Sequence, residues 1–349
     1  MTITGGTGID TIIMKHANDV LDAGTVTATV DTLSIVQNAV LGGFLIDLSS
    51  TTDQVTTYNG AANAAVQKGF DNADLSGVTG NFGADITARA LGSTITGTAN
   101  ADQINGGAGN DTFIVNAGTV ANSDVMTGGA GTLDTLQIAT GLTYTQATDA
   151  SLATVEVISL VGTAAVVLTG QTEAFTINGG AGSNAITGGT GNDTIALTVD
   201  GAVDTINVRT TTGFETITSF LVGAGGDVIA GNISTGGAPA TPVSSADAGT
   251  ALTVASTDEV VILRTADNAT FADLAAVRTR LAAGAESFAA SDQFYIVYSN
   301  AAGVTNIAIL TTDAGNTDIT AADTLVDVVT LTGSVNSALL LAANFANLA

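Results

Sequence analysis

The sequence contains no cysteine and no tryptophan, and only seven lysines and arginines, two prolines and one histidine. Without cysteine there are neither disulfide bonds nor thiol chemistry. A single histidine, His16, excludes a zinc site that uses two or more histidines. Seven basic residues form no patch that neutralises nucleic-acid phosphates, so we expect no nucleic-acid partner. Aromatic residues are only 4% of the chain, which indicates a thin core made of Val, Ile, Leu, Ala and Thr.

Long apolar runs are also missing. No run approaches the length of a transmembrane helix, so we expect no membrane insertion. The N-terminus lacks the basic region and apolar segment of a cleavable signal peptide. The protein is therefore expected either to be cytoplasmic or to leave the cell by a route that does not read the N-terminus. The Gly-x-Ser-x-Gly elbow of many hydrolases is absent too, and we expect no enzymatic activity.

Glycine and aspartate are abundant instead. The chain has 42 glycines, and its 32 acidic residues against 7 basic ones give a net charge of −25. Nearly all the acids are aspartates, which suit turns and metal sites, rather than glutamates. Such a chain should repel itself unless cations bind it. Solubility alone is the simpler explanation of the acidity.

A nine-residue repeat links these two features. Residues 106–114 read Gly-Gly-Ala-Gly-Asn-Asp-Thr-Phe-Ile and fit the Gly-Gly-x-Gly-x-Asp-x-apolar-x pattern of calcium-binding β-helix repeats. The pattern is complete again from Gly5 and from Gly188. Incomplete copies start at Gly97, at Gly128 with one inserted residue, at Gly179 with Asn184 in the aspartate position, and at Gly223.

The chemistry of this repeat favours calcium. Glycines without Cβ atoms allow a tight turn that aims its carbonyl groups inward. The sixth-position aspartate adds a hard anionic oxygen, and Ca²⁺ takes six to eight such oxygens. One repeat cannot close a site, whereas two stacked repeats can. The alternative is a plain Gly-Asp turn that needs no metal.

The repeats predict an all-β fold, a parallel β-roll or β-helix solenoid with these turns over residues 1–235. An Asp-Thr-apolar triplet supports it, because an acid at a turn edge followed by a β-branched strand opening is typical of a solenoid coil. The triplet recurs at Asp10, Asp31, Asp111, Asp134, Asp193, Asp204 and Asp323, with Glu215 as a variant. A single helical turn is predicted at 63–69.

Residues 236–243 contain both prolines and predict a linker. Residues 244–349 predict a strand-rich C-terminal domain with one short helix. That helix is expected to start with a capping box at Thr270, with Phe271 and Leu281 on its buried face and Arg278 on its solvated face. Residues 293–299 and 305–311 predict a β-hairpin, and 323–331 a strand or a short helix.

The nonapeptides resemble those of the RTX (repeats-in-toxin) family. Residues 292–297, 331–335 and 342–345 are similar to the C-terminal region of type I-secreted RTX proteins. That similarity implies a C-terminal secretion signal and an extracellular or cell-surface location on a Gram-negative bacterium. The lysine-poor composition further resembles RTX-type surface-layer (S-layer) proteins.

The resemblance also implies which residues would bind Ca²⁺. By position in the repeat, the implied metal ligands are Asp10, Asp102, Asp111, Asp134, Asp193, Asp227, Gly5, Gly106, Ala108, Gly188 and Thr190. Asn184 lacks the charge of the expected aspartate, and an inserted residue precedes Asp134.

Three functions follow as hypotheses. The first is a non-enzymatic structural protein that assembles with copies of itself, in a calcium-dependent way, into a surface lattice or filament. The second is a calcium-stabilised adhesin or glycan-binding module, with cell-surface polysaccharide as its partner. The third, a secreted hydrolase, conflicts with the missing catalytic motifs.

Overall fold

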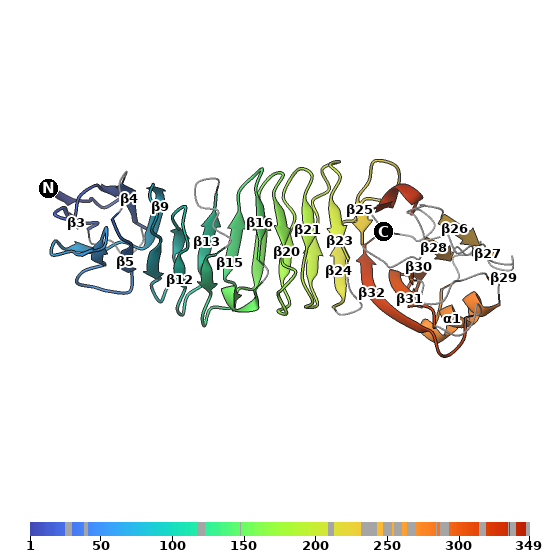
Figure 1. Ribbon diagram of the computed structural model, residues 1–349. Helices are drawn as coiled ribbons and strands as arrows, with labels where there is room; N and C mark the ends of the chain where they lie inside the picture. The colour runs from blue at the N-terminus through green and yellow to red at the C-terminus, as the bar shows by residue number, and fades with distance from the viewer. Residues whose placement is uncertain are drawn as a thin grey trace. The chain divides into compact units, whose positions relative to one another are not determined.

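The computed structural model describes the chain apart from residues 25–29, 38–40, 117–122, 147, 209–212, 232–242, 247–252, 255–259, 264–269, 284, 287–292, 314–318, 334, 336–339 and 347–349. The described residues are nearly all β: a parallel β-solenoid, a strand-rich C-terminal region and one short α-helix (Figure 1). The predicted fold class is confirmed. The chain divides into two compact units, residues 1–171 and 172–349.

In the first unit, each solenoid coil adds one strand to a parallel sheet. Its strands, in spatial order, are β2 (Thr11–Met14), β4 (Thr32–Gln37), β9 (Asn72–Val78), β11 (Thr94–Thr96), β13 (Thr112–Val115), β15 (Thr135–Ile138) and β18 (Val157–Leu160). A second sheet takes the order β17 (Leu152–Ala153), β14 (Val125–Thr127), β12 (Gln103–Asn105), β10 (Ala84–Thr87), β5 (Phe44–Asp47), β6 (Val55–Tyr58) and β7 (Ala61–Ala62).

Smaller pairings complete this unit. Strands β1 (Thr2–Thr4), β3 (Val20–Asp22) and β8 (Gln67–Lys68) form a parallel sheet, and β16 (Thr143–Thr145) pairs with β19 (Ala165–Val167). A 3₁₀ turn, η1, spans Asp149–Ser151. The predicted helical turn at 63–69 is wrong, because β8 lies there. The Asn63 amide instead bonds to the Val55 carbonyl oxygen and to Gln67.

The core consists of stacked apolar side chains, one from the middle of each short strand. Residues of the first sheet that share a register position are Ile95, Phe113, Leu136 and Ile158, and those of the second sheet are Ile46, Ile86, Ile104, Met126 and Leu152. All of them are buried. Because side chains alternate along a strand, their neighbours face outward, which explains the Thr-apolar-Thr pattern of the sequence.

The second unit repeats this arrangement. Strands β20 (Thr176–Asn178), β22 (Thr194–Ala196) and β24 (Glu215–Thr218) are parallel neighbours in one sheet, and β21 (Ala185–Thr187), β23 (Thr205–Asn207), β25 (Val228–Ala230) and β33 (Phe345–Ala346) in another. The long strand β32 (Thr324–Thr332) pairs in parallel with β24, and Leu331 lies beside Ile217. The C-terminal region therefore continues the solenoid register.

From β32 the sheet turns antiparallel and then parallel again. It continues through β31 (Thr305–Thr311), β30 (Gln293–Ser299), β28 (Val260–Leu263) and β26 (Val243–Ala246), while β27 (Thr253–Val254) pairs with β29 (Ala285–Glu286). The predicted hairpin is confirmed as β30 and β31 in full register. For residues 323–331 the sequence predicted either a strand or a short helix, and the structure has the strand β32. A 3₁₀ turn, η3 (Ala342–Asn344), precedes β33.

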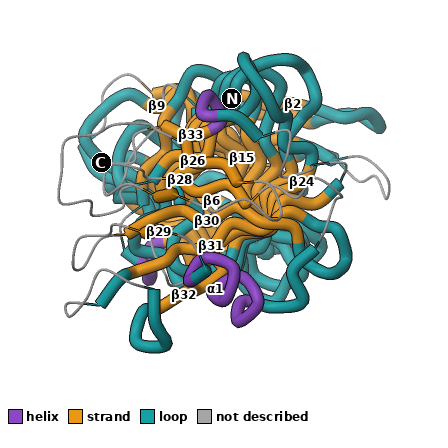
Figure 2. Tube along the Cα trace, turned by 90° about the vertical axis from the view of Figure 1, so that its right-hand side faces the viewer, coloured by secondary structure: helices purple, strands orange, loops and turns teal. Residues whose placement is uncertain are grey.

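One helix, α1 (Leu274–Ala282), lies beside β31 and β32 (Figure 2). Its Val277 and Leu281 are buried against β30 and β31. The predicted start was three residues early: Asp273, not Thr270, caps the helix by accepting the Ala276 N–H at 2.8 Å. Phe271 precedes the helix and bridges to Asn300.

Arg278 is half-buried rather than solvated. Its guanidinium donates to the carbonyl oxygens of Thr320 and Asp323, each at 2.6 Å. Among the described residues, no helix has both the length and the apolar composition needed to cross a membrane. The predicted linker lies outside the described residues except for Val243, so the boundary at 236–243 stays a prediction.

Candidate functional site: the stacked Gly-Asp turns

An acidic side chain stands immediately before most strands of the solenoid. Its carboxylate accepts the main-chain N–H of the equivalent residue one coil earlier. Asp31 accepts the Asp10 N–H at 2.8 Å, and Asp134 accepts the Asp111 N–H at 2.7 Å. We name the largest set of these aligned positions the carboxylate ladder; its rungs, in order, are Asp10, Asp31, Asp71, Ser93, Asp111, Asp134 and Glu156. Such a bond joins each neighbouring pair except Asp71 and Ser93, which are aligned by strand pairing alone.

Shorter ladders follow the other sheets. In the first unit, Asp102 accepts the Ala84 N–H and Asp124 accepts the Asp102 N–H. In the second unit, Asp193 accepts the Phe175 N–H at 2.8 Å. The Asn184, Asp204 and Asp227 rungs form another ladder there, joined by N–H donation to Asp204 at 2.8 Å and to Asp227 at 2.9 Å. These bonds need no metal, so every ladder acid has a structural role of its own.

Three of the six predicted carboxylates keep one oxygen that this role does not use. Asp111, Asp134 and Asp193 are at most 1% exposed. In each, Oδ1 accepts a main-chain N–H, whereas the buried Oδ2 has no hydrogen-bond partner. A buried carboxylate oxygen without a partner is costly. A proton or a cation would remove that cost.

The other three predicted carboxylates have no buried oxygen that lacks a hydrogen-bond partner. Asp10 Oδ2 accepts the Gly6 N–H at 2.7 Å. Asp102 accepts the N–H and the hydroxyl of Thr98 in addition to its ladder bond. Asp227 accepts the Leu221 N–H at 2.7 Å. These three positions therefore offer less to a metal ion than the sequence pattern suggests.

Burial changes the protonation of the ladder acids. Loss of solvation raises the pKa of the Asp111 carboxyl to about 7. The hydrogen bond from the Ser93 N–H lowers this pKa, and the negative charge of Asp134 raises it further. Loss of solvation likewise raises the pKa of Asp193 to about 7 and that of Asp204 to about 6. Burial, and then the charge of Asp193, raises the pKa of Glu215 to about 8.

Carbonyl oxygens of adjacent coils lie close to the turn glycines beside Asp111 and Asp134. A methyl group on Gly106 would lie 2.3 Å from the Gly128 carbonyl oxygen and 2.7 Å from Asp111 Oδ2. A methyl group on Gly131 would lie 2.3 Å from the Gly109 carbonyl oxygen and 2.7 Å from both Asp134 oxygens. Two coils thus bring carboxylate and carbonyl oxygens together at glycines, the donor set of a hard cation.

Acid clustering alone does not make a metal site here. Among the described residues, no three His, Cys, Asp or Glu side chains converge closely enough to hold a metal ion. An ion at these turns would depend on main-chain carbonyls, as the glycine-rich turn sequence requires. Asp111 and Asp134, with the carbonyls of Gly109 and Gly128, are the residues that fit this role best.

The remaining predicted turn residues lie around these acids. A methyl group on Gly5 would lie 2.7 Å from Asp10 Oδ2, and one on Gly188 would lie 1.8 Å from Asp193 Oδ2. The carbonyl of Thr190 faces Gly213 of the next coil. Ala108 is exposed at the turn surface.

The irregular repeats keep the ladder register. Despite the residue inserted before it, Asp134 aligns with Asp111, because Thr112 pairs with Thr135. Asn184 occupies a rung and donates its N–H to Asp204. Asp323 differs from the prediction, since its carboxylate closes a C-terminal loop by accepting the N–H groups of Asp313 and Thr320.

The repeat pattern missed Asp71, Asp124 and Glu156. None of them follows a glycine-rich turn or precedes threonine. Spacing could have found Asp124 and Glu156, because each lies 22 residues after the aspartate whose N–H it accepts. Asp71 lies 40 residues after Asp31 and has no such signal.

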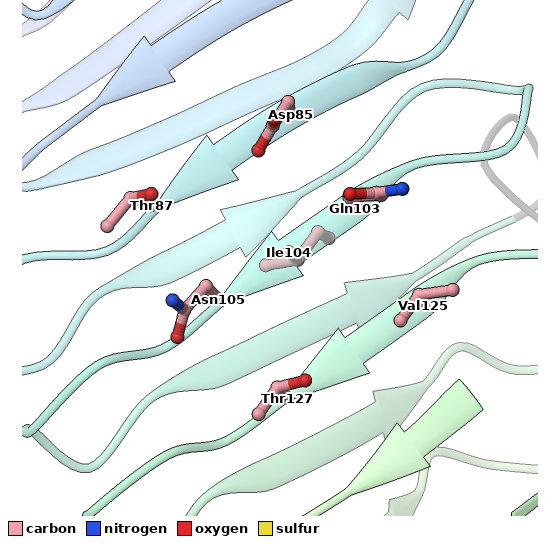
Figure 3. Close-up of a pocket in the computed structure, with 7 residues that line it drawn as sticks. All are labelled: Asp85, Thr87, Gln103, Ile104, Asn105, Val125 and Thr127. Carbon is pink, nitrogen blue, oxygen red and sulfur yellow. The ribbon is translucent and has the colours of Figure 1, made fainter. Parts of the chain in front are cut away.

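A shallow polar groove lies on the outer face of the second sheet in the first unit (Figure 3). Its volume is about 250 Å³. Two rows of outward side chains line it, one from each of two register positions on β10, β12 and β14: Asp85, Gln103 and Val125 in one row and Thr87, Asn105 and Thr127 in the other.

Neither the known protein-family models nor the curated protein sequences contain a match to this chain.

Proposed function

We propose that this protein is a non-enzymatic, extracellular structural protein of the RTX type. In this proposal it binds Ca²⁺ at its stacked Gly-Asp turns and assembles with copies of itself into an S-layer-like surface lattice or a filament. Bound calcium would neutralise buried carboxylates and link neighbouring coils. The type I secretion route and the Gram-negative cell surface belong to the same proposal.

The observation that carries the proposal is the unpartnered Oδ2 of Asp111, Asp134 and Asp193. Each is buried beside the first glycine of its turn, and a neighbouring coil presents a carbonyl oxygen at the glycines beside Asp111 and Asp134. At a net charge of −25, the chain also resists compaction where calcium is scarce. Binding free energy would then become folding free energy at millimolar calcium.

The test is negative-stain imaging with light scattering of the full chain, in about 5–10 mM CaCl₂, a range that saturates weak extracellular sites, and in chelator. We expect ordered sheets or filaments in calcium that dissolve on chelation. The double variant D111N/D193N should need more calcium, because two unpartnered oxygens are gone.

D85N is the matched control, since Asp85 is exposed on a strand away from the turns. It should assemble like the unaltered protein. NaCl at matched ionic strength separates specific binding from screening. Assembly in chelator, or equal calcium dependence of D111N/D193N and D85N, would contradict the proposal.

The polar groove favours a second candidate, a glycan-binding module. Asp85, Gln103 and Asn105 are exposed, and adjacent parallel strands repeat such side chains every roughly 4.8 Å. An extended polysaccharide could hydrogen-bond to both rows at once. Binding of purified polysaccharide by a monomer, lost in Q103A/N105A and kept in D111N/D193N, would favour this candidate over assembly.

A further inference from the structure

One rung of the carboxylate ladder has no acid. Ser93 takes the place of the aspartate, because Thr94 pairs with Thr112 and aligns Ser93 with Asp111. Counting back through the same turn, Arg89 takes the place of Gly107, the second glycine of the nonapeptide. The strands before the turn agree, since Thr87 pairs with Asn105. The coil that lacks the acid therefore carries a cation.

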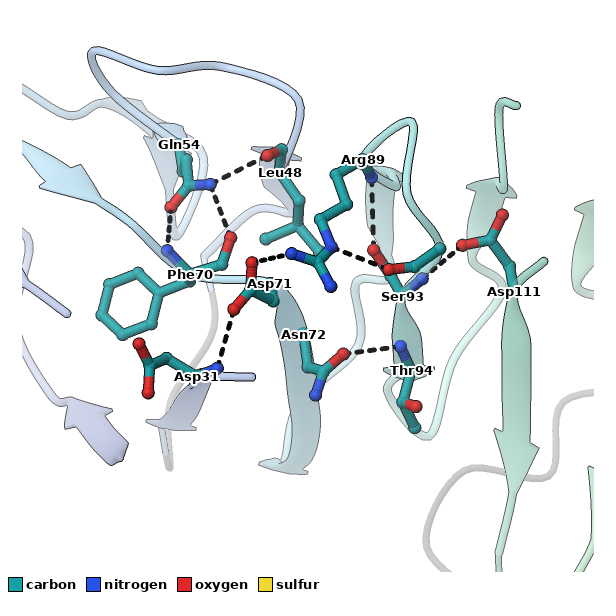
Figure 4. A network of polar contacts seen from close by, with 11 residues as sticks. Asp31, Leu48, Gln54, Phe70, Asp71, Asn72, Arg89, Ser93, Thr94 and Asp111 are labelled. Atoms are coloured by element: carbon teal, nitrogen blue, oxygen red, sulfur yellow. Dashed lines mark hydrogen bonds and ion pairs between the residues drawn. The ribbon is translucent and has the colours of Figure 1, made fainter. Parts of the chain in front are cut away.

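The Arg89 side chain lies along the ladder (Figure 4). Its Nη1 pairs with Asp71 Oδ1, and its Nε donates to the Gly92 carbonyl oxygen at 2.8 Å. Its main-chain N–H donates to Ser93 Oγ at 3.2 Å. The Arg89 and Asp71 side chains are only 24% and 15% exposed. Solvent therefore screens this ion pair less than a pair on the open surface.

Asp71 is satisfied as a result. Its Oδ2 accepts the Asp31 N–H at 2.9 Å, and its Oδ1 receives the guanidinium. Asp111, one rung beyond Ser93, uses only Oδ1, which accepts the Ser93 N–H at 2.6 Å. The charge of Arg89 also lowers the pKa of Asp111, against the larger effect of burial. The guanidinium thus acts on the acids on both sides of the Ser93 rung.

We propose that Arg89 is a resident cation that takes the place of a bound metal ion between the Asp71 and Asp111 rungs. Coils around Arg89 then keep their structure without calcium, while the Asp111 and Asp134 turns depend on it. The first unit would contain a calcium-independent segment next to a calcium-dependent one. The dependence of the second segment, though not the role of Arg89, rests on the proposed function.

Hydrogen exchange of the full chain, followed by mass spectrometry in calcium and in chelator, tests this. In chelator, peptides over residues 84–96 should stay protected in the unaltered protein. R89Q should speed their exchange roughly tenfold, since a hydrogen bond to a charged group is lost. Calcium should slow exchange over residues 105–116 in both proteins.

K15Q is the matched control, because it removes the same charge from an exposed side chain in the same unit. It should leave the 84–96 peptides unchanged, and R89K should fall between R89Q and the unaltered protein, since lysine keeps the charge without the planar fork. If R89Q unfolds entirely in chelator, the exchange of the double variant D71N/R89Q tests the role of Arg89 instead. Recovered protection in that variant supports a charge pair.

Three results would overturn the role of Arg89. They are unchanged exchange over 84–96 in R89Q, an equal effect of K15Q, and no recovery in D71N/R89Q after R89Q unfolds. An exchange rate over residues 105–116 that is the same in calcium and in chelator would instead contradict the proposed function. The two failures are therefore distinguishable in one experiment.

Discussion

At the scale of single residues, the first glycine of each complete nonapeptide is crowded by the aspartate of the same repeat. Gly106 and Gly188 lie so close to the carboxylates of Asp111 and Asp193 that a Cβ atom has no room. Gly106 is confined from a second side by the Gly128 carbonyl of the next coil. The glycines therefore serve close packing between coils as well as the tight turn.

This packing gives a prediction for Gly106. G106A should lower the free energy of unfolding by about 2 kcal/mol, because the new methyl group overpacks a site bounded by main chain. G8A is the control, since no atom lies within 4 Å of a methyl group at Gly8, and it should change stability by less than about 0.5 kcal/mol. Denaturant unfolding in calcium measures both. Equal effects of the two substitutions would contradict the crowding at Gly106.

At the scale of elements, each short strand was predictable where its sequence alternates threonine with an apolar residue. The hairpin of β30 and β31 was predictable too, because two runs rich in aromatic and β-branched residues flank the Asn300–Gly303 turn. The segment at 63–69 was not, because Gln67 is held by the Asp19 carbonyl, 48 residues away in the chain. Local pattern carries no information about such a contact.

The predicted start of α1 was wrong for a local reason. Both Thr270 and Asp273 are good N-caps, and the sequence does not distinguish them. The helix starts after Asp273 because the main chain of Phe271 pairs with Asn300, and this pairing keeps Phe271 extended. An extended residue there leaves Asp273 as the first position free to cap the helix.

The ladder as an element predicts a specific pH dependence. The pKa of Asp111 and of Asp193 is about 7 in the fold, against about 3.9 in an unfolded chain. Between these values the folded state binds more protons than the unfolded state, so stability falls as pH rises. In chelator, the unfolding temperature should therefore decrease from pH 5 to pH 8, with little further loss above pH 8 from these two groups.

D111N/D193N should make this slope shallower, since neither amide titrates, while Asp204 and Glu215 keep their raised pKa values. D85N removes one exposed charge and should leave the slope nearly unchanged. Calcium competes with protons for the carboxylates, so saturating calcium should flatten the slope as well. Thermal unfolding followed by circular dichroism measures all four cases. An unfolding temperature that rises from pH 5 to pH 8 in chelator would contradict the buried acids.

At the scale of the whole molecule, the acids fall into two populations. Some, such as Asp85 and Asp200, are exposed, whereas Asp31, Asp111 and Asp134 of the ladder lie inside the stack. The repeat pattern identified Asp111, Asp134 and Asp193 as special but could not show that Asp102 and Asp227 are already satisfied. That distinction depends on Thr98 and Leu221, whose N–H groups are placed by the path of each turn.

Arg89 could not be predicted either. It has no motif, and its role follows only from the register of the coil that contains it. Once the coils are aligned, the exchange of an acid for a serine and of a glycine for an arginine is visible. In a solenoid, aligning the coils by strand register thus reveals substitutions such as Ser93 and Arg89 that a search for the repeat motif does not find.

The ladder bonds also span chain segments of unequal length. Successive rungs are 18 residues apart between Ser93 and Asp111, 23 between Asp111 and Asp134, and 40 between Asp31 and Asp71. Each of these three intervals ends in the same N–H to carboxylate bond. The distance between rungs is therefore set by strand pairing, and the chain between them is free to vary. For an engineer, exposed turns away from the crowded Gly-Asp turns are therefore sites where an epitope could be inserted while strand pairing keeps the coils in register.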